Sequence, residues 1–147
     1  TFVEIAKLWF MFCLVWSVCA TVNEDGRRKL DAYIREKEGI FPLKDTVYEY
    51  FVDVRKKCFS SWEEKLSDNW RYSPGSPFFK IIVPTVDTVR YRCIVETLLA
   101  AGYPSLLTGP VGTGKTSTAQ SVLSSLDLTR FSVLNVNLSA QTSSINV

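Results

Sequence analysis

The sequence has 147 residues, of which 46% are hydrophobic and 22% charged, a composition typical of a globular chain of about one domain. It excludes a wholly disordered, collagen-like or low-complexity chain. The formal net charge of +2 is too small to imply nucleic acid or an anionic membrane as an electrostatic partner, and the absence of histidine excludes Ser/His/Asp and Cys/His nucleophiles and imidazole metal ligands.

The most apolar part of the sequence is residues 8–22, fifteen residues without a charge. A membrane span needs about 20 apolar residues, whereas about 10 to 14 are typical of a buried helix, so this length falls between the two. We favour a buried core helix. A membrane or targeting segment is the alternative, because Ser17, Cys19 and Ala20 would suit a signal-peptide cleavage site, although neither an initiating Met nor a basic leader precedes them.

Four cysteines are spread along the sequence, at Cys13, Cys19, Cys58 and Cys93. Their spacing fits neither a CxxC pair nor the dense pattern of a small disulfide scaffold. We therefore expect these thiols to be reduced and mostly buried.

Residues 23–38 carry ten charges, five of each sign. Apolar side chains recur among them at helical spacing, at Leu30, Tyr33 and Ile34. Asp31 and Arg35 can form an i,i+4 pair, and Gly39 stands where a helix commonly ends. The pattern predicts an amphipathic surface helix whose charges face solvent, because the signs cancel.

Residues 46–52 are rich in β-branched and aromatic side chains, and Phe59 and Trp62 follow a basic turn at 55–57. This predicts a short hairpin or an aromatic-packed extension. Little positive charge lies between the aromatic residues of this region, so we expect their side chains to pack in the protein rather than to stack on nucleic-acid bases. These residues are Trp62, Trp70, Tyr72, Phe78 and Phe79. Residues 73–77 (SPGSP) are the best linker candidate.

After this linker the pattern is that of an α/β unit. Residues 79–83 read as a strand that Pro84 ends, and Thr85 can cap a helix with Asp87 in its first turn. The apolar stripe of this helix is Tyr91, Ile94, Val95, Leu98 and Leu99. Gly102 ends it, and residues 105–108 form a short strand.

Residues 109–116 (GPVGTGKT) match the pattern G-x-x-x-x-G-K-[ST] in full. The match predicts a phosphate-binding loop formed by Gly109, Pro110, Val111, Gly112, Thr113 and Gly114. Gly109 and Gly114 permit backbone angles at which successive amides point inward, and Gly112 and Thr113 extend the same loop. Lys115 can reach the β- and γ-phosphates. The Thr116 hydroxyl suits a Mg²⁺ ion. A helix follows, with the apolar stripe Ala119, Val122, Leu123 and Leu126, and its N-terminus favours an anion. An ordinary glycine turn is the alternative.

Residues 132–138 predict a further strand of a parallel sheet, after a connecting loop at 127–130. The 31 residues after Thr116 contain no apolar run that ends in an acidic residue. A P-loop enzyme needs such a strand end to bind Mg²⁺ and to activate water. We therefore expect this chain to contain the phosphate-binding loop but not the residues that catalyse hydrolysis. Together with the first residue, Thr1, and the polar final run, this indicates a piece of a longer protein.

Three segments occur in a specific order: residues 82–91 (IVPTVDTVRY), 106–117 (LLTGPVGTGKTS) and 133–144 (VLNVNLSAQTSS). Together they resemble the start of the third AAA+ module of dynein heavy chains, most closely the axonemal, inner-arm type. Residues 9–36 resemble the helical lid of the second module. Residues 47–53 and 61–66 resemble the short extension that leads to the next ATPase core.

The resemblance implies an α/β fold in which an incomplete P-loop NTPase (AAA+) core occupies residues 79–147. A mainly α-helical lid subdomain with a short β extension precedes it at 1–72, and a linker lies at 73–78. A lid helix packed between ring modules would be apolar nearly all round, which accounts for residues 8–22 without a membrane.

The resemblance also implies ATP and Mg²⁺ as cofactors. Lys115 and Thr116 would bind the triphosphate and Mg²⁺, with Ser117 beside them. Val83, Pro84 and Thr85 would contact adenine. In the family this third site is regulatory: it gates the main ATPase of the first module and thereby microtubule release.

The implied partners are the other AAA+ modules of the same heavy chain, dynein intermediate, light intermediate and light chains, and microtubules through the full-length motor, with no nucleic acid or membrane. The implied location is the cytoplasm, the cytoskeleton and the ciliary axoneme. Two alternatives remain at this point, a small membrane-anchored P-loop nucleotide-binding protein and an inactive truncated fragment.

Overall fold

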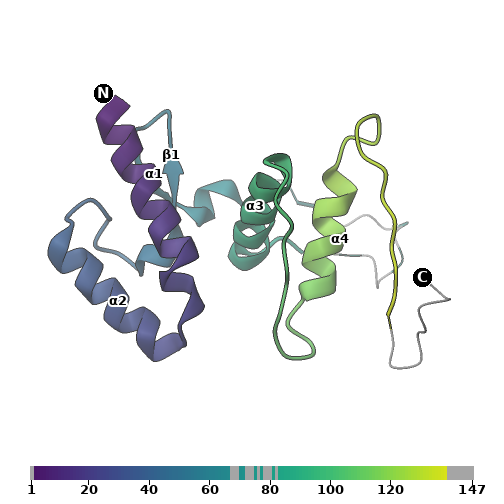
Figure 1. Cartoon of the computed structure of the whole chain (residues 1–147), viewed down its shortest axis with the longest axis horizontal. Helices are drawn as coiled ribbons and strands as arrows, with labels where there is room; N and C mark the ends of the chain where they lie inside the picture. Colours follow the sequence, from purple (N-terminus) through teal and green to yellow (C-terminus); the bar gives the residue numbers. More distant parts are fainter. Residues whose placement is uncertain are drawn as a thin grey trace. The chain divides into compact units, whose positions relative to one another are not determined.

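The computed structural model describes residues 2–66, 70–71, 75, 77, 81 and 83–138. Two compact units, Thr1–Val89 and Arg90–Val147, are treated separately below. In chain order the elements are α1 (Phe2–Ser17), η1 (Cys19–Thr21), α2 (Glu24–Lys37), η2 (Val47–Glu49), β1 (Tyr50–Asp53), β2 (Cys58–Ser61), η3 (Trp62–Lys65), α3 (Val86–Ala100) and α4 (Lys115–Ser125) (Figure 1). The predicted strand at 79–83 and the linker at 73–78 fall largely outside the described residues.

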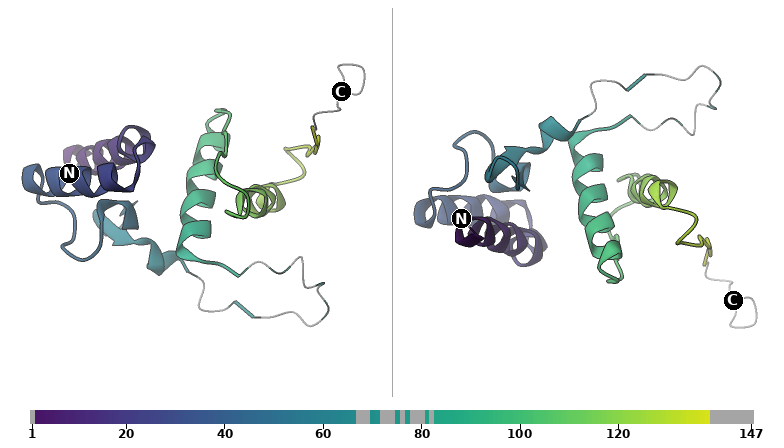
Figure 2. Two further views of the ribbon diagram at one scale, coloured as in Figure 1. Left: turned by 90° about the horizontal axis from the view of Figure 1, so that it is seen from below. Right: turned by 90° about the horizontal axis from the view of Figure 1, so that it is seen from above.

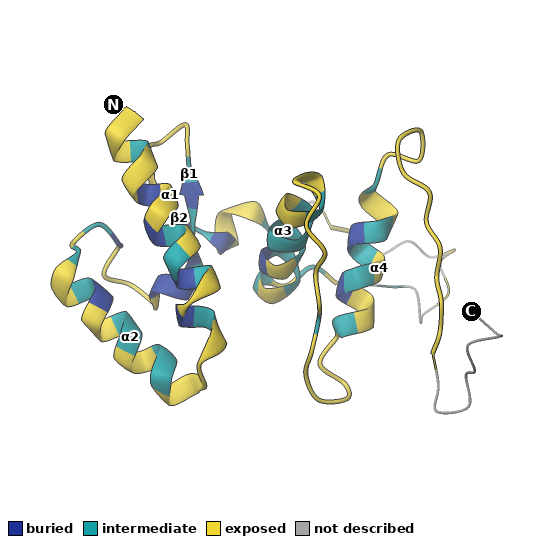
Figure 3. Cartoon of the chain, in the orientation of Figure 1, coloured by how far each residue is buried: buried dark blue, intermediate teal, exposed yellow. Residues whose placement is uncertain are grey.

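Helix α1 buries one face in the core of the first unit. Leu8, Met11 and Val15 lie on that face at helical spacing, and Cys19 continues it into η1. Figure 3 shows buried and exposed residues alternating along the helix. The exposed apolar residues include Phe2, Val3, Trp9, Phe10 and Val18. The predicted core helix is therefore confirmed for one face, but α1 begins before residue 8, and within this chain it is not covered all round.

Residues Phe2–Thr21 form a helix long and apolar enough to cross a bilayer by length and composition. It is the one such helix in the described part of the chain. The core helix of a soluble protein passes the same test, so the finding is weak evidence for a membrane. The packing of Leu8, Met11 and Val15 against the core favours the interpretation as a core helix.

Strands β1 and β2 form an antiparallel hairpin in which Val52 lies opposite Phe59. The buried ring of Phe59 on β2 stacks on that of Phe41, in the loop after α2, with 4.1 Å between the ring centroids. Trp62 follows β2 directly and is fully buried, with its ring 5.2 Å from that of Phe51. The predicted hairpin and the packing role of Trp62 are confirmed. Trp70 is 40% exposed, and Tyr72, Phe78 and Phe79 lie outside the described residues.

Helix α2 begins after Asn23, whose side chain accepts a hydrogen bond from the Gly26 amide at 3.0 Å. The predicted Asp31–Arg35 pair forms, with 3.1 Å between Arg35 Nε and Asp31 Oδ1. Both side chains are largely buried, so this pair departs from the solvated face that the charge pattern predicts. Gly39 follows the C-cap residue Glu38, as predicted.

Helix α3 has the predicted caps at both ends. The Thr85 hydroxyl accepts a hydrogen bond from the Thr88 amide at 3.3 Å, and the Thr85 amide donates to the Thr88 hydroxyl at 2.8 Å. At the other end Gly102 has φ +79°, and the Tyr103 amide donates to the Leu98 carbonyl at 2.9 Å. This is a Schellman motif, which explains why the helix stops where the glycine stands.

Within the second unit, the part of α3 from Arg90 onward lies beside α4 (Figure 2). Val122 of α4 is buried, and the other members of the predicted stripe, Ala119, Leu123 and Leu126, are half-buried. The Ser125 hydroxyl donates to Glu96 at 2.6 Å and ties the end of α4 to α3. Glu96 also accepts a hydrogen bond from Arg92 at 2.8 Å. Apolar packing and side-chain hydrogen bonds therefore both hold the two helices together.

The structure differs from the sequence prediction at residues 105–108 and 132–138. Neither segment is a strand, and both expose apolar side chains, with Leu106 86% and Leu134 84% exposed. A strand is stabilised by a hydrogen-bonded neighbour, and β1–β2 is the only paired sheet among the described residues. A turn does form at the predicted loop 127–130, where Asp127 accepts hydrogen bonds from the amide and hydroxyl of Thr129, but no strand follows it at 132–138.

The four cysteines are all free thiols. Only Cys19 is buried; Cys13 and Cys58 are exposed, and Cys93 is half-buried. The expectation of reduced thiols fits this arrangement, but the expectation that most are buried is wrong. Cys13 lies on the exposed side of α1, and Cys58 is the exposed first residue of β2. Neither side chain is part of the core.

Candidate functional site

The glycine loop at residues 109–114 joins an extended segment to the first turn of α4. Three of its residues have positive φ angles: Gly109 (+151°), Gly112 (+84°) and Gly114 (+76°). Side chains with a Cβ are strained in this region, so the backbone path requires glycine at each of these positions. The sequence predicted this requirement for Gly109 and Gly114, and the structure adds Gly112 on the same ground.

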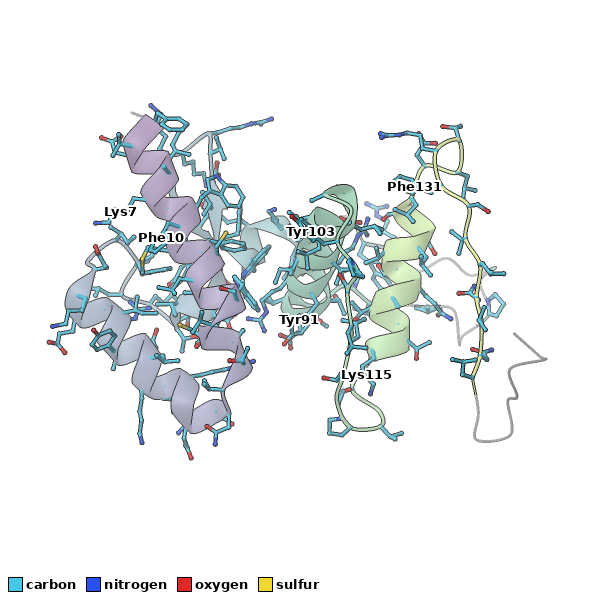
Figure 4. All side chains as sticks on the ribbon, viewed as in Figure 1. Lys7, Phe10, Tyr91, Tyr103, Lys115 and Phe131 are labelled. Carbon is cyan, nitrogen blue, oxygen red and sulfur yellow. The ribbon has the colours of Figure 1, made fainter. Side chains whose placement is uncertain are left out.

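Lys115 is the first residue of α4, and its side chain folds back over the loop. Its Nζ donates to the Pro110 carbonyl at 2.5 Å and to the Thr113 hydroxyl at 3.2 Å. Figure 4 shows Lys115 at the end of α4 where the loop joins the helix. The loop thus has a positive charge at its mouth, supplied by the residue that the motif predicts for phosphate contact.

The N-terminus of α4 faces the same loop. Its cap residue Gly114 offers no side chain, and the first backbone bond of the helix is from the Thr118 amide to the Gly114 carbonyl at 2.9 Å. The amides of residues 115–117 therefore precede the helical ladder. Unsatisfied amides and the positive end of the helix dipole both favour an anion here. Thr116 and Ser117 lie exposed on this first turn.

The structure brings together the predicted residues from Gly109 to Ser117, because they form one continuous loop and turn. Val83, Pro84 and Thr85, predicted to contact adenine, belong to the first compact unit. Val83 is 54% exposed, and the Thr85 side chain caps α3. Their contact with a base stays a prediction.

One contact in the loop was missed from the sequence. The Thr113 hydroxyl donates to the Pro110 carbonyl at 2.9 Å while it accepts from Lys115. The motif leaves this position open, so the spacing carries no signal for it. The only hint in the sequence is a hydroxyl residue two positions before the lysine.

An open cleft of about 330 Å³ lies elsewhere in the second unit. Its lining comes from the ends of α3 and α4 and from the turn that follows, and includes Arg92, Glu96, Leu126, Asp127 and Phe131. Hydrogen bonds from the hydroxyl and the amide of Thr129 lower the pKa of Asp127. None of the loop residues 109–117 lines this cleft, so it is separate from the glycine loop.

Comparison with known proteins extends these observations. Residues 70–147 match the model of the P-loop containing dynein motor region, and residues 1–64 match that of the dynein heavy chain AAA lid domain. The chain is 61% identical over 141 residues to dynein axonemal heavy chain 2 of Mus musculus and 58% identical over 146 residues to dynein axonemal heavy chain 2 of Homo sapiens. It is 44% identical over 141 residues to the dynein-1-beta heavy chain, flagellar inner arm I1 complex, of Chlamydomonas reinhardtii.

These matches cover 96%, 99% and 96% of this chain, but only 3% of each relative. The chain therefore spans about 3% of the length of the curated relatives that it matches. Two matched regions in this order, with the glycine loop inside the second, confirm the resemblance to dynein heavy chains that the sequence motifs indicated. The chain belongs to the dynein heavy chain family, and it carries an AAA lid domain followed by a P-loop-containing motor region.

Proposed function

We propose that residues 109–117 bind the triphosphate of ATP. The observation that carries this proposal is the convergence of three features on one short loop: glycine-only backbone angles, the Lys115 ammonium and the N-terminus of α4. Each favours a negatively charged ligand, and the loop offers no acidic side chain of its own.

The residues take distinct roles in this proposal. The loop amides around Gly109, Gly112 and Gly114 wrap the phosphates, with Pro110 and Val111 forming the outer turn. Lys115 contacts the β- and γ-phosphates as a point charge. The first turn of α4, with Thr116 and Ser117, completes the cradle. Val83, Pro84 and Thr85 offer apolar and backbone groups to the adenine ring.

Thr116 is the residue that fits Mg²⁺. Its hydroxyl lies exposed on the first turn of α4, next to Lys115. Mg²⁺ commonly takes one or two protein oxygens and completes its shell with water and substrate phosphates. The described residues contain no cluster of three acidic or cysteine ligands, so a phosphate-bound ion is the form that suits this site. Bound Mg²⁺ would neutralise charge on the phosphates.

At the level of the whole protein, we infer an ATP-binding segment of an axonemal dynein heavy chain, a microtubule-based motor of cilia and flagella. The inner-arm type is supported by the 44% identical Chlamydomonas relative, a heavy chain of the flagellar inner arm I1 complex. The segment works with the other AAA+ modules of the same heavy chain, and the assembled motor with intermediate, light intermediate and light chains and microtubules. Its place is the cytoskeleton of the ciliary axoneme, and its ATP site regulates the main ATPase. Family membership favours this role over a small membrane-anchored protein.

Calorimetric titration with ATP tests the loop. We expect Lys115→Ala to weaken ATP binding by about 10- to 100-fold, because a charge-assisted contact is lost, and to leave adenosine binding unchanged. Lys29→Ala, which removes an exposed lysine from α2, is the matched control and should bind ATP like the wild type. Equal weakening of ATP and adenosine by Lys115→Ala would contradict the proposal.

The size of the endogenous polypeptide tests the wider role. An antibody to residues 61–72 is expected to detect a band of several hundred kilodaltons that is enriched in cilia. A band near the 16.6 kDa of this chain alone would contradict the proposed motor.

A further inference from the structure

The Thr113 side chain connects the two ends of the glycine loop. Its hydroxyl donates to the Pro110 carbonyl at 2.9 Å and accepts from Lys115 Nζ at 3.2 Å. A Cβ built on Gly109 would lie 3.4 Å from this same oxygen. The hydroxyl is therefore inside the loop, between its first residues and the lysine that follows it.

The Lys115 ammonium is held by the loop itself. It has three protons to donate, and two acceptors, the Pro110 carbonyl and the Thr113 hydroxyl, lie within 3.2 Å of its nitrogen. With the bond from Thr113 to Pro110, three groups close a ring of hydrogen bonds. A phosphate can accept hydrogen bonds from all three ammonium protons only when it replaces the Pro110 carbonyl and the Thr113 hydroxyl as acceptors.

We propose that Thr113 is a positioning residue that latches Lys115 in the nucleotide-free loop. This inference rests on the proposed ATP-binding function and adds a mode of regulation to the same site. The latch stabilises the empty loop, so it lowers the affinity for nucleotides whose β- and γ-phosphates must take over the ammonium. It does not affect ligands that lack those phosphates, and the loop therefore discriminates by the number of phosphates.

Three variants separate the latch from a structural role. Thr113→Val keeps the side-chain shape but removes the hydroxyl, whereas Thr113→Ser keeps the hydroxyl. Thr97→Val is the matched control, because Thr97 is also exposed and its hydroxyl donates to a backbone carbonyl, that of Cys93, at 2.7 Å. Wild-type behaviour is expected of Thr113→Ser and Thr97→Val.

The first measurement needs no nucleotide. The full 147-residue chain is acetylated under limiting reagent, and mass spectrometry gives the rate at Lys115 relative to exposed Lys29. Loss of one net hydrogen bond should raise this ratio about threefold in Thr113→Val. An unchanged ratio in Thr113→Val would overturn the latch, whatever the chain does with ATP.

The second measurement is calorimetric binding of ATP and AMP. Thr113→Val should bind ATP about threefold more tightly, with AMP affinity unchanged. Weaker ATP binding in Thr113→Val, restored by Thr113→Ser, would overturn the latch and make Thr113 a ligand-contacting residue. If the wild-type chain binds no ATP, the proposed function fails while the acetylation ratio still decides the latch.

Discussion

The Asp31 carboxylate on α2 accepts a hydrogen bond from the backbone amide of Val47, sixteen residues later, at 2.7 Å. The same oxygen accepts from Arg35 Nε, and Arg35 also donates to the carbonyls of Pro42 and Asp45. An ion pair that the sequence suggested for a solvated helix face thus fixes the loop between α2 and the hairpin.

Removal of Asp31 should therefore destabilise the first unit. Asp31→Ala leaves the Val47 amide without its acceptor and Arg35 without its carboxylate, and we expect a loss of about 2 to 3 kcal/mol in the free energy of unfolding by urea. Asp31→Asn, which keeps an acceptor, should lose less.

Another ion pair on the same helix provides the control for Asp31. Glu24 and Arg28 are also spaced i,i+4, but both are exposed, so Glu24→Ala should change stability by less than about 1 kcal/mol. Equal effects of Asp31→Ala and Glu24→Ala would contradict the role assigned to Asp31.

Trp62 is the largest fully buried side chain among the described residues, and its truncation should be the most disruptive apolar change there. Trp62→Ala is expected to cost about 3 to 5 kcal/mol, as large core truncations do. Its indole Nε1 has no hydrogen-bond partner among the described residues, so Trp62→Phe should cost clearly less. Urea unfolding measures both, with Trp70→Ala as the exposed control. A cost for Trp62→Phe as large as that for Trp62→Ala would contradict the packing described.

The hairpin turn should weaken in acid. Hydrogen bonds from the Lys56 and Arg55 amides lower the pKa of Asp53 in the folded chain. A lowered folded pKa means that this stabilisation is complete above the unfolded value of about 3.9 and is lost as the pH falls through the folded pKa. Amide exchange at Arg55 and Lys56 should accelerate in that range. Asp53→Asn should abolish the pH dependence; its persistence would contradict this assignment.

Thiol reactivity should follow exposure. Cys13 and Cys58 are exposed, whereas Cys19 is buried and burial raises the pKa of its thiol. Iodoacetamide should therefore modify Cys13 and Cys58 before Cys19 in the native chain, as read by mass spectrometry. In urea the three rates should converge. If iodoacetamide modified Cys19 in the native chain as fast as Cys58, the burial of Cys19 in η1 described above would be contradicted.

The features predicted well from the sequence are those determined by residues close together in the chain. Thr85 and Gly102 mark the two ends of α3, through hydrogen bonds between residues at most five positions apart. The glycine loop is predictable because its backbone angles are ones that other residues avoid. The hairpin formed because its two strands are separated by a short turn.

The features that sequence reasoning missed depend on contacts between distant or unspecified positions. Residues 105–108 and 132–138 have strand-like composition, but a strand requires a partner, and none pairs with them among the described residues. The second role of Asp31 depends on where the chain returns at Val47. The Thr113 bridge depends on a rotamer that no spacing rule describes.

Binding of the triphosphate by residues 109–117 is the central claim, and backbone amide NMR of the chain during titration with MgATP tests it most directly. We predict chemical shift changes centred on Gly109, Gly112, Gly114 and residues 115–117, with no such changes there on adding adenosine. Two results would contradict triphosphate binding by this loop: unchanged chemical shifts of these amides at saturating MgATP, or shift changes confined to the cleft residues Glu96 and Asp127.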